Sequence, residues 1–405
     1  MRVRAPMTAR PVQAVLAAGG RGERLRPLTD ERPKPMIEFH GRPFLDYLLD
    51  MLVDNGVRRV LLLLGYRADV IVDRYGDGYR GIDIEYAVSP PAIQTGRRVW
   101  LARDRIDPTF LFLYCDNYWP MTWPRMWDSY VAGGRPAQLT VYRNDDGYSR
   151  DNVTVDQAGR VIRYDRTRMA PELRGVEIGY AIMDRRVLEL LDGSDVAFED
   201  AVYPTLVERD QLGAFVTPHR YYSVGTLARL PATADFLERR PAVILDRDGV
   251  LNERPPRAQY VRSPDELRWL PQARDALRLF AESGYRVIVA TNQAGIGRGR
   301  MSEQDLAAVN AALIEGAAAA GGRIDAIYHC PHDWDDGCEC RKPRPGMLIR
   351  AQRELGLDLT RTVFIGDDER DAATAAAAGS PSILVDEDRN LLDVTRELLA
   401  TANRD

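Results

Sequence analysis

The chain contains 405 residues with a formal net charge of -5 at pH 7, and 28% of its residues are charged. This length exceeds one ordinary hydrophobic core and predicts two domains of roughly 100–250 residues. A negative net charge without a long basic run gives no reason to expect a DNA or RNA partner. The sequence lacks an apolar stretch of about 18 residues and a signal-peptide pattern, so we expect a cytoplasmic protein without a membrane partner.

Two series of short apolar runs, each run followed by a loop and a helical pattern, predict two α/β domains with doubly wound sheets. The first series begins at VQAVLAAGG and the second at PAVILDRDG. The charged segment ATADFLERRP separates them, which places the boundary near Arg240. The predicted regions are an N-terminal tail (1–11), a first domain (12–235), a linker (236–241), a second domain (242–395) and a C-terminal tail (396–405).

A glycine-rich segment, LAAGGRGERLRPLTDERPKPM, follows the first expected strand. Glycines let backbone N–H groups approach phosphates closely, and nearby basic side chains offset the phosphate charge. The segment is not a Walker loop, because G-x-x-x-x-G-K-[ST] is absent. The candidate phosphate-binding residues are Gly19, Gly20, Arg21, Gly22, Arg24 and Lys34.

The segment LYCDNYWP ends an expected buried strand and presents one carboxylate, Asp116. An aspartate at the end of such a strand raises the question of which second carboxylate shares its site. Trp119, Trp123 and Trp127 follow at a spacing of four, which favours a packed helix face over a surface that stacks on a base or sugar.

Together, the glycine-rich segment and Asp116 resemble the signature of sugar-1-phosphate nucleotidylyltransferases over roughly residues 12–235. The resemblance implies a Rossmann-like fold in which Arg24 and Lys34 contact the triphosphate and the sugar phosphate. It also implies that Asp116 binds Mg²⁺ while the sugar phosphate attacks the α-phosphate in line. Contacts to the sugar hydroxyls fall, by the same resemblance, on Thr95, Gly96, Asp165 and Glu177.

One part of that signature differs. The family usually supplies a second magnesium-binding aspartate from a D-x-G-T segment, whereas this chain reads YYSVGT with Ser223 at that position. A metal contributes several kcal/mol of transition-state stabilisation, and each ~1.4 kcal/mol is tenfold in rate. The candidates to compensate are Glu199, Asp200 and a water bridged by Ser223. RYDRT, in turn, places Asp165 and Arg166 where Glu-Lys is common in the family.

The C-terminal half carries acidic and basic groups directly after three expected strands. VILDRDGVLN supplies Asp246 to attack phosphorus and Asp248 to protonate the leaving oxygen. FIGDDERD supplies Asp367, which with the Asp246/Asp248 pair would hold Mg²⁺. Polar groups for the phosphate come from VATNQ and CRKPRPG: Thr291, Asn292, Arg341 and the catalytic Lys342.

These residues resemble the haloacid dehalogenase superfamily, and the strings DRDGVLN, TNQAGIGRG and CRKPRPGM resemble its heptose bisphosphate phosphatase branch. The resemblance covers essentially all of residues 242–385. It implies that Asp246 is the nucleophile, Asp248 the general acid/base and Asp367 a magnesium ligand. Histidinol phosphate phosphatases share much of this pattern.

Cys330-x-His332, five residues, and Cys338-x-Cys340 provide four ligands close in sequence, enough for a closed tetrahedral Zn²⁺ site. The surrounding CPHDWDDGCECRKP is polar and turn-rich, so it offers no core in which to bury three thiols. No position is left open for substrate, and the predicted zinc is therefore structural, directing the adjacent Arg341 and Lys342.

The two resemblances together predict a bifunctional enzyme of nucleotide-activated heptose synthesis. Its C-terminal half would remove the 7-phosphate of a heptose 1,7-bisphosphate, and its N-terminal half would transfer a nucleotidyl group to the resulting heptose 1-phosphate. GTP is the nucleoside triphosphate that the resemblance favours. Two alternatives stay open: a phosphatase with a catalytically silent sugar-nucleotide-binding half, and the same two activities on another sugar phosphate.

Overall fold

The computed structural model describes residues 10–402 and divides the chain into two compact units between Leu237 and Glu238. Most of the predicted N-terminal tail, 1–11, therefore lies outside the described residues. The predicted linker, 236–241, begins too early. Phe236 and Leu237 end helix α6 (Leu230–Leu237) and are buried in the core of the first unit, so they belong to that unit.

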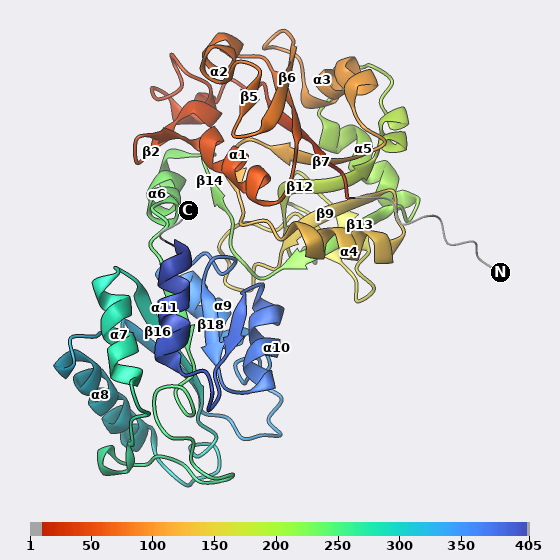
Figure 1. Cartoon of the computed structure of the whole chain (residues 1–405). Coiled ribbons are helices and arrows are strands. Elements are labelled where there is room, and N and C mark those ends of the chain that lie inside the picture. Colours follow the sequence, from red (N-terminus) through yellow and green to blue (C-terminus); the bar gives the residue numbers. More distant parts are fainter. Residues whose placement is uncertain (1–9, 403–405) are drawn as a thin grey trace. The chain divides into compact units, whose positions relative to one another are not determined.

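The first unit is built on an eight-stranded sheet with the order β13-β9-β12-β7-β1-β4-β6-β5 (Figure 1). Strands β1, β4, β6 and β7 run parallel, whereas β12 is antiparallel to both β7 and β9. Their runs of apolar residues fit a sheet that is covered on both faces. The strands are β1 (Gln13–Ala18), β4 (Arg59–Leu64), β5 (Gly78–Tyr79), β6 (Ile82–Val88), β7 (Thr109–Tyr114), β9 (Ala137–Tyr142), β12 (Val176–Asp184) and β13 (Leu212–Thr217).

Two hydrophobic cores lie on opposite faces of this sheet, since alternate residues of a strand point to opposite sides: Leu16 joins one core and Val15 the other. The first core contains α1 (Phe44–Asp54), α2 (Ala68–Tyr75), α4 (Trp123–Gly133) and α6, and the second contains α3 (Thr95–Ala102) and α5 (Phe198–Glu208). Trp119, Trp123 and Trp127 are buried in the first core, as the sequence predicts.

Short strand pairs complete the first unit. They are β2 (Glu38–Phe39) with β3 (Arg42–Pro43), β8 (Asn117–Tyr118) with β14 (Tyr222–Ser223), and β10 (Val153–Val155) with β11 (Val161–Tyr164). The β8–β14 pair joins the residues after Asp116 to the late segment YYSVGT, so two stretches about a hundred residues apart in the chain meet at the end of β7.

The second unit has a five-stranded, fully parallel sheet with the order β17-β16-β15-β18-β19. Its strands are β15 (Ala242–Leu245), β16 (Arg286–Asn292), β17 (Ala326–Cys330), β18 (Val363–Gly366) and β19 (Ser382–Leu384). Helices α7 (Ala273–Glu282), α8 (Glu303–Ala319) and α11 (Leu391–Ala402) contribute to one core, and α9 (Gly346–Leu355) and α10 (Glu369–Ala378) to the other. Both units therefore have the α/β, doubly wound class that the sequence predicts.

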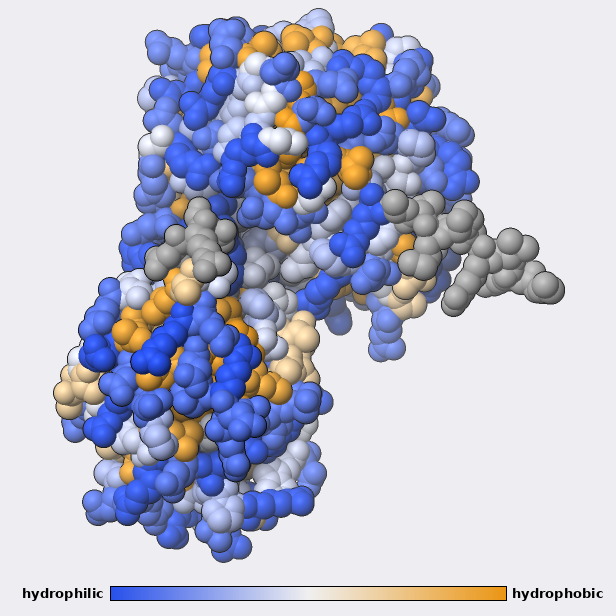
Figure 2. Space-filling view, in the orientation of Figure 1, coloured by the Kyte–Doolittle hydropathy of each residue, from blue (hydrophilic) through white to orange (hydrophobic). Residues whose placement is uncertain are grey.

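The predicted C-terminal tail, 396–405, is wrong for the part that is described. Helix α11 continues to Ala402 and packs against α7, with Leu392 and Val394 in the core and Leu398 against it. Among the described residues, no helix is long and apolar enough to cross a membrane. Figure 2 shows hydrophilic residues over most of the visible face, with smaller hydrophobic areas between them.

Candidate active sites

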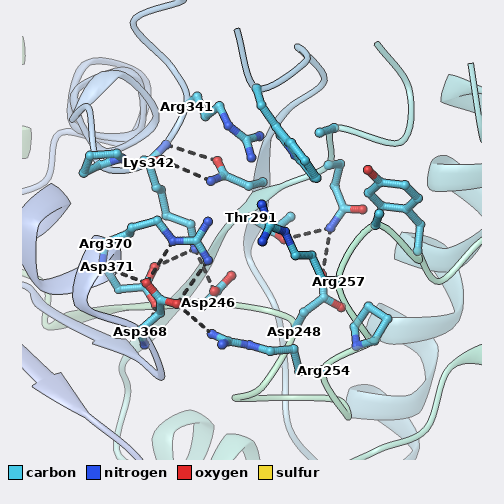
Figure 3. Close-up of a pocket in the computed structure, with 18 of the residues that line it drawn as sticks. Asp246, Asp248, Arg254, Arg257, Thr291, Arg341, Lys342, Asp368, Arg370 and Asp371 are labelled. Carbon is cyan, nitrogen blue, oxygen red and sulfur yellow. Dashed lines mark hydrogen bonds and ion pairs between the residues drawn. The ribbon is translucent and has the colours of Figure 1, made fainter. Parts of the chain in front are cut away.

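A cavity of about 690 Å³ opens at the carboxyl edge of the second sheet. Because β16, β15 and β18 are parallel neighbours, their carboxyl ends bring Thr291, Asp246 and Asp367 to the same edge. Figure 3 shows Asp246, Asp248 and Thr291 in this cavity, together with Lys342 from the loop that precedes α9. The structure thus brings Asp246, Asp248, Thr291 and Lys342 together from separate segments of the sequence.

Lys342 lies between two carboxylates. Its Nζ is 2.7 Å from Asp246 Oδ2 and 2.7 Å from Asp371 Oδ1, and all three side chains are buried. Burial, the largest influence, raises the pKa of Asp246, although the neighbouring ammonium opposes that shift. Burial disfavours the ammonium as well, but the two carboxylates raise the pKa of Lys342. This arrangement holds a cation beside the atom that would attack phosphorus.

Asp248 is oriented by several donors. Its carboxylate accepts from Arg247 Nη2 at 3.0 Å, Asn252 Nδ2 at 2.9 Å and Gln293 Nε2 at 3.0 Å. Gln293 also donates to Thr291 Oγ1 at 2.9 Å. These bonds fix the direction of the Asp248 side chain, and its predicted roles as acid/base group and magnesium ligand stay predictions.

The group that could hold a cation consists of Asp246, Asp367 and Asp371, whose carboxylate oxygens lie within 4.8 Å of one another. Carboxylate oxygens are the ligands that Mg²⁺ prefers. Gly249, with φ +94°, permits the close approach of Asp367, since a Cβ there would lie 1.6 Å from Asp367 Oδ2. The residues present fit a magnesium ion.

Asp371 was not predicted as a site residue, although it stands in the same FIGDDERD segment as Asp367. It forms the N-terminal capping box of α10 with Asp368, and that cap directs its carboxylate back toward the cavity edge. Asn292 lines the cavity, as predicted for a phosphate-binding residue. Its side chain also donates to Lys342 O at 3.3 Å and accepts from Lys342 N at 3.1 Å, so it positions the lysine backbone.

Five arginines line the same cavity: Arg254, Arg257, Arg341, Arg344 and Arg370. Arg254 pairs with Asp367 at 2.6 Å and Arg370 with Asp368 at 2.8 Å. Among residues 10–402, neither Arg257 nor Arg341 forms an ion pair with a carboxylate, and Arg257 lies 5.5 Å from the ring centre of Trp334. Of these five, the sequence predicts only Arg341, because scattered arginines in loops carry no spacing signal.

The cysteine and histidine cluster is assembled as expected. The ligand atoms of Cys330, His332, Cys338 and Cys340 lie within 4.8 Å of one another. The Sγ atoms of Cys330 and Cys338 are 3.6 Å apart, and His332 Nδ1 is 3.2 Å from Cys340 Sγ. Tetrahedral zinc with Zn–S of ~2.3 Å places sulfur atoms about 3.8 Å apart, so the four residues fit a zinc ion.

A second cavity, of about 280 Å³, lies at the carboxyl edge of the first sheet. Of the predicted phosphate-binding residues, Gly19, Gly20 and Lys34 line it together with Thr95 and Asp116. Arg21 and Arg24 are exposed and outside its lining. Gly22 has φ +68°, and a Cβ there would lie 2.7 Å from Lys34 Cγ, so this glycine makes room for the lysine side chain.

Asp116 and Ser223 are brought together in space. Ser223 is paired with Asn117 across β8 and β14, and Val224 N donates to Asp116 O at 2.9 Å. Lys34 Nζ lies 3.4 Å from Asp116 Oδ2. Among the described residues, no group of three acidic, histidine or cysteine ligands includes Asp116. The backbone of the segment that carries Ser223 therefore lies beside Asp116.

The predicted sugar contacts have different surroundings in the structure. Asp165 caps its own turn: its carboxylate accepts from the backbone N–H groups of Thr167, Met169 and Ala170 and from the Thr167 hydroxyl. The hydroxyl bond, followed by the backbone bonds, lowers the pKa of Asp165. Asp165 therefore orders its own turn and lies outside the lining of the cavity, and its predicted sugar contact stays a prediction. A Cβ on Gly96 would lie 2.7 Å from Val196 O, so close backbone packing requires this glycine. Thr95 lines the cavity and donates to Glu199 at 3.4 Å.

Glu177 is an acid in an environment that favours its neutral form. Burial raises its pKa to about 8, against the effect of the Gly179 N–H that it accepts, and Glu199 adds to the increase. An acid with a raised pKa binds its proton more tightly in the folded state. Its ionisation therefore destabilises the fold as pH rises from the ordinary value, 4.5, towards 8.

We accordingly expect Glu177→Gln to gain stability relative to the unsubstituted protein as pH rises, by about 2 kcal/mol or more between pH 5 and pH 8. Urea unfolding of the first unit at both pH values, without added metal, measures this difference. Glu208→Gln, at an exposed position of α5, serves as the control and should show no such trend. A pH-independent difference for Glu177→Gln would contradict the assignment.

Comparison with known proteins gives a family match in each of the two units. Residues 13–164 match the family model described as nucleotidyl transferase, and residues 339–399 match one described as HAD-hydrolase-like. The D-glycero-beta-D-manno-heptose-1,7-bisphosphate 7-phosphatase of Rhodopseudomonas palustris is 39% identical over 150 residues, which are 35% of this chain and 82% of that protein. The phosphatase of the same name from Pseudomonas aeruginosa is 41% identical over 146 residues, 36% of this chain and 81% of that protein.

Solved structures were also found. The phosphatase of Bordetella bronchiseptica complexed with magnesium and phosphate is 35% identical and covers 40% of this chain and 99% of its own, with a TM-score of 0.38. HddC from Yersinia pseudotuberculosis is 22% identical and covers 56% of this chain and 100% of its own, with a TM-score of 0.49.

The chain is thus an enzyme that joins a nucleotidyl transferase domain to a haloacid dehalogenase-type phosphatase domain. Through its C-terminal unit it belongs to the family of D-glycero-beta-D-manno-heptose-1,7-bisphosphate 7-phosphatases.

Proposed function

We propose that the protein catalyses two consecutive steps in the synthesis of a nucleotide-activated heptose. The C-terminal unit hydrolyses the 7-phosphate of heptose 1,7-bisphosphate, and the N-terminal unit transfers a nucleotidyl group from a nucleoside triphosphate, with GTP favoured, to heptose 1-phosphate. The observation that carries the proposal is the buried contact of Asp246 with Lys342 at 2.7 Å, inside an arginine-lined cavity of a heptose bisphosphate phosphatase family member.

In the first step, Asp246 attacks phosphorus and the bond from phosphorus to the sugar oxygen breaks, while Asp248 gives that oxygen a proton. Water then attacks the aspartyl phosphate, Asp248 accepts its proton, and phosphate leaves. Lys342 neutralises charge on the transferring group, and Thr291 donates a hydrogen bond to it. Magnesium on Asp246 and Asp367, if bound there, would shield the phosphate charge from the attacking carboxylate.

A bisphosphate requires cationic groups for the phosphate that does not react. Arg257 and Arg341 meet this requirement, because both line the cavity and, within residues 10–402, neither is paired with a carboxylate. A guanidinium group can bind two phosphate oxygens at once. This supports a substrate with a second phosphate over a sugar monophosphate.

The second step joins heptose 1-phosphate to the α-phosphate of the nucleoside triphosphate and releases pyrophosphate. Lys34 and Asp116 face the cavity where this reaction would occur. Magnesium held at Asp116 would stabilise charge on the triphosphate.

Phosphorus NMR tests the proposal as a whole. The purified protein is incubated with heptose 1,7-bisphosphate, Mg²⁺ and GTP, ATP, CTP and UTP, and the α and β anomers are compared. Loss of the 7-phosphate signal followed by sugar-nucleotide and pyrophosphate signals is expected. No phosphate release from either anomer, with release from a hexose bisphosphate instead, would overturn the choice of sugar.

The cysteine and histidine cluster leads to a separate prediction, that the protein holds one structural zinc. Cys338→Ser should lose the zinc and lower the melting temperature of the second unit by about 10 °C. Phosphatase activity should fall about tenfold, because Lys342 follows Cys340 closely on the same loop. Elemental analysis, calorimetry and phosphate release measure the three effects.

Cys115→Ser is the matched control, since Cys115 is a buried cysteine of the other unit. It should keep both the zinc and the phosphatase activity. A Cys338→Ser protein that retains stoichiometric zinc would show that the cluster is not the zinc site.

A second candidate function follows from Ser223. If the hydroxyl beside Asp116 cannot replace the missing carboxylate, the N-terminal unit binds a sugar nucleotide without turning it over. The NMR experiment would then stop at heptose 1-phosphate while phosphate release continues.

A further inference from the structure

Helix α3 carries a buried arginine, Arg98, in the lining of the cavity beside Asp116. The residue is 4% exposed. Within residues 10–402 its guanidinium forms no ion pair with a carboxylate, and burial lowers its pKa, with Asp195 only partly opposing the shift. Burying a charge without an ionic partner is costly, so the position calls for a reason beyond packing.

The guanidinium joins the carboxyl end of β4 to the loops that follow β1 and β6. Nη1 donates to Leu64 O at 2.8 Å and to Ser89 Oγ. Nη2 donates to three carbonyl oxygens, those of Pro90 at 2.9 Å, Pro91 at 3.2 Å and Gly19 at 3.4 Å. These bonds satisfy the two terminal nitrogens but leave the positive charge without a negative partner.

Two glycines leave the space that this side chain occupies. A Cβ on Gly19 would lie 2.5 Å from Arg98 Cζ, and a Cβ on Gly65 would lie 2.5 Å from Arg98 Nη1. For Gly19 the three nearest atoms all belong to Arg98. The sequence suggests that Gly19 serves close approach of phosphate, whereas the structure shows that it also makes room for the guanidinium.

Two of the segments that Arg98 joins line the cavity: the glycine loop, with Gly19 and Gly20, and the loop after β6, with Pro91. Lys34 lines the same cavity. We propose that Arg98 is a positioning residue for the nucleoside triphosphate: it fixes the glycine loop against the loop 89–91, and its uncompensated charge favours an anionic ligand there. This inference rests on the proposed nucleotidyl transfer.

Arg98→Met tests it in the full-length protein, with GTP, ATP, CTP and UTP as probes in the presence of Mg²⁺. The KM and Kd of the nucleotide that the unsubstituted protein uses should rise about tenfold or more. The KM for heptose 1-phosphate, and phosphate release by the other unit, should stay within about twofold. Arg98→Lys, which retains the charge but not the planar fork, should recover part of the loss.

Arg97→Met is the matched control. Arg97 is the preceding residue of α3, but its guanidinium lies over the ring of Trp100 at 4.7 Å, outside the cavity lining. The same change in net charge there should leave nucleotide KM unchanged. A merely structural role for Arg98 would lower the melting temperature and kcat of the transferase without raising nucleotide KM.

Gly19→Ala keeps the arginine but displaces it, and so tests the same contact if Arg98→Met does not fold. As a single substitution it should raise the nucleotide Kd. In an Arg98→Ala background, where the space is free, Gly19→Ala should raise that Kd much less. Unchanged nucleotide KM in Arg98→Met, or additive effects in the double variant, would overturn the inference while transfer itself persists. If the unsubstituted protein neither binds nor uses any of the four nucleotides, the proposed transferase function fails, and the inference fails with it.

Discussion

Asp246→Asn is expected to lower kcat for phosphate release from heptose 1,7-bisphosphate by about a thousandfold or more. Asparagine keeps the size of the side chain but cannot form the acyl phosphate. The contact with Lys342 at 2.7 Å would also lose its ionic character. A phosphate-release assay on the purified variant measures the effect.

Asp275→Asn is the control for this variant, because Asp275 is a half-exposed aspartate of α7 in the same unit. It should retain full activity, and nucleotidyl transfer from heptose 1-phosphate should persist in Asp246→Asn. Protein quenched with acid during turnover should carry an alkali-labile phosphate that Asp246→Asn lacks. A variant with more than about a tenth of the original kcat would show that Asp246 is not the nucleophile.

Asp116→Asn should reduce nucleotidyl transfer to heptose 1-phosphate by about a hundredfold or more, while phosphate release continues at its normal rate. Asp116 is the acidic residue that lines the cavity, and its pairing with Lys34 at 3.4 Å would be weakened as well. Pyrophosphate release with heptose 1-phosphate supplied directly separates this activity from the first step. Asp128→Asn, at an exposed position of α4, is the matched control.

Ser223→Asp distinguishes a working site from a silent one. If the native serine belongs to a working active site, a second carboxylate beside Asp116 makes the charge of that site more negative, and the rate of nucleotidyl transfer should fall. A large gain in rate would instead show that the native N-terminal unit lacks a required metal ligand, and it would favour the binding-module function. Equal rates of nucleotidyl transfer by Asp116→Asn and the unsubstituted protein would show that Asp116 takes no part in the reaction.

Much of the phosphatase site could be predicted because its geometry is local. Each of Asp246, Thr291 and Asp367 ends or directly follows a strand of one parallel sheet, and parallel strands bring their carboxyl ends to one edge. The four zinc-binding candidates are similarly close in sequence, since Cys330 ends β17 and the loop that follows carries the other three.

Other roles could not be predicted, because residue type does not determine where a side chain points. Asp165 has the charge expected of a sugar ligand, yet its carboxylate accepts the N–H groups of its own turn. Asn292 follows Thr291 directly, yet it holds the backbone of Lys342. Asp371 could not be predicted, because its proximity to Lys342 depends on the capping of α10.

The sequence by itself determined the two-domain α/β class, the order of the motifs along the chain, and the grouping of the four cysteine and histidine side chains. Periodicity and spacing along the chain carry that information directly. Only the tertiary structure decided that the segment with Ser223 lies beside Asp116, and that Arg98 bonds to the end of β4 and to the loops after β1 and β6. Such contacts join residues far apart in sequence, and their geometry depends on how the sheet packs, which no local pattern records.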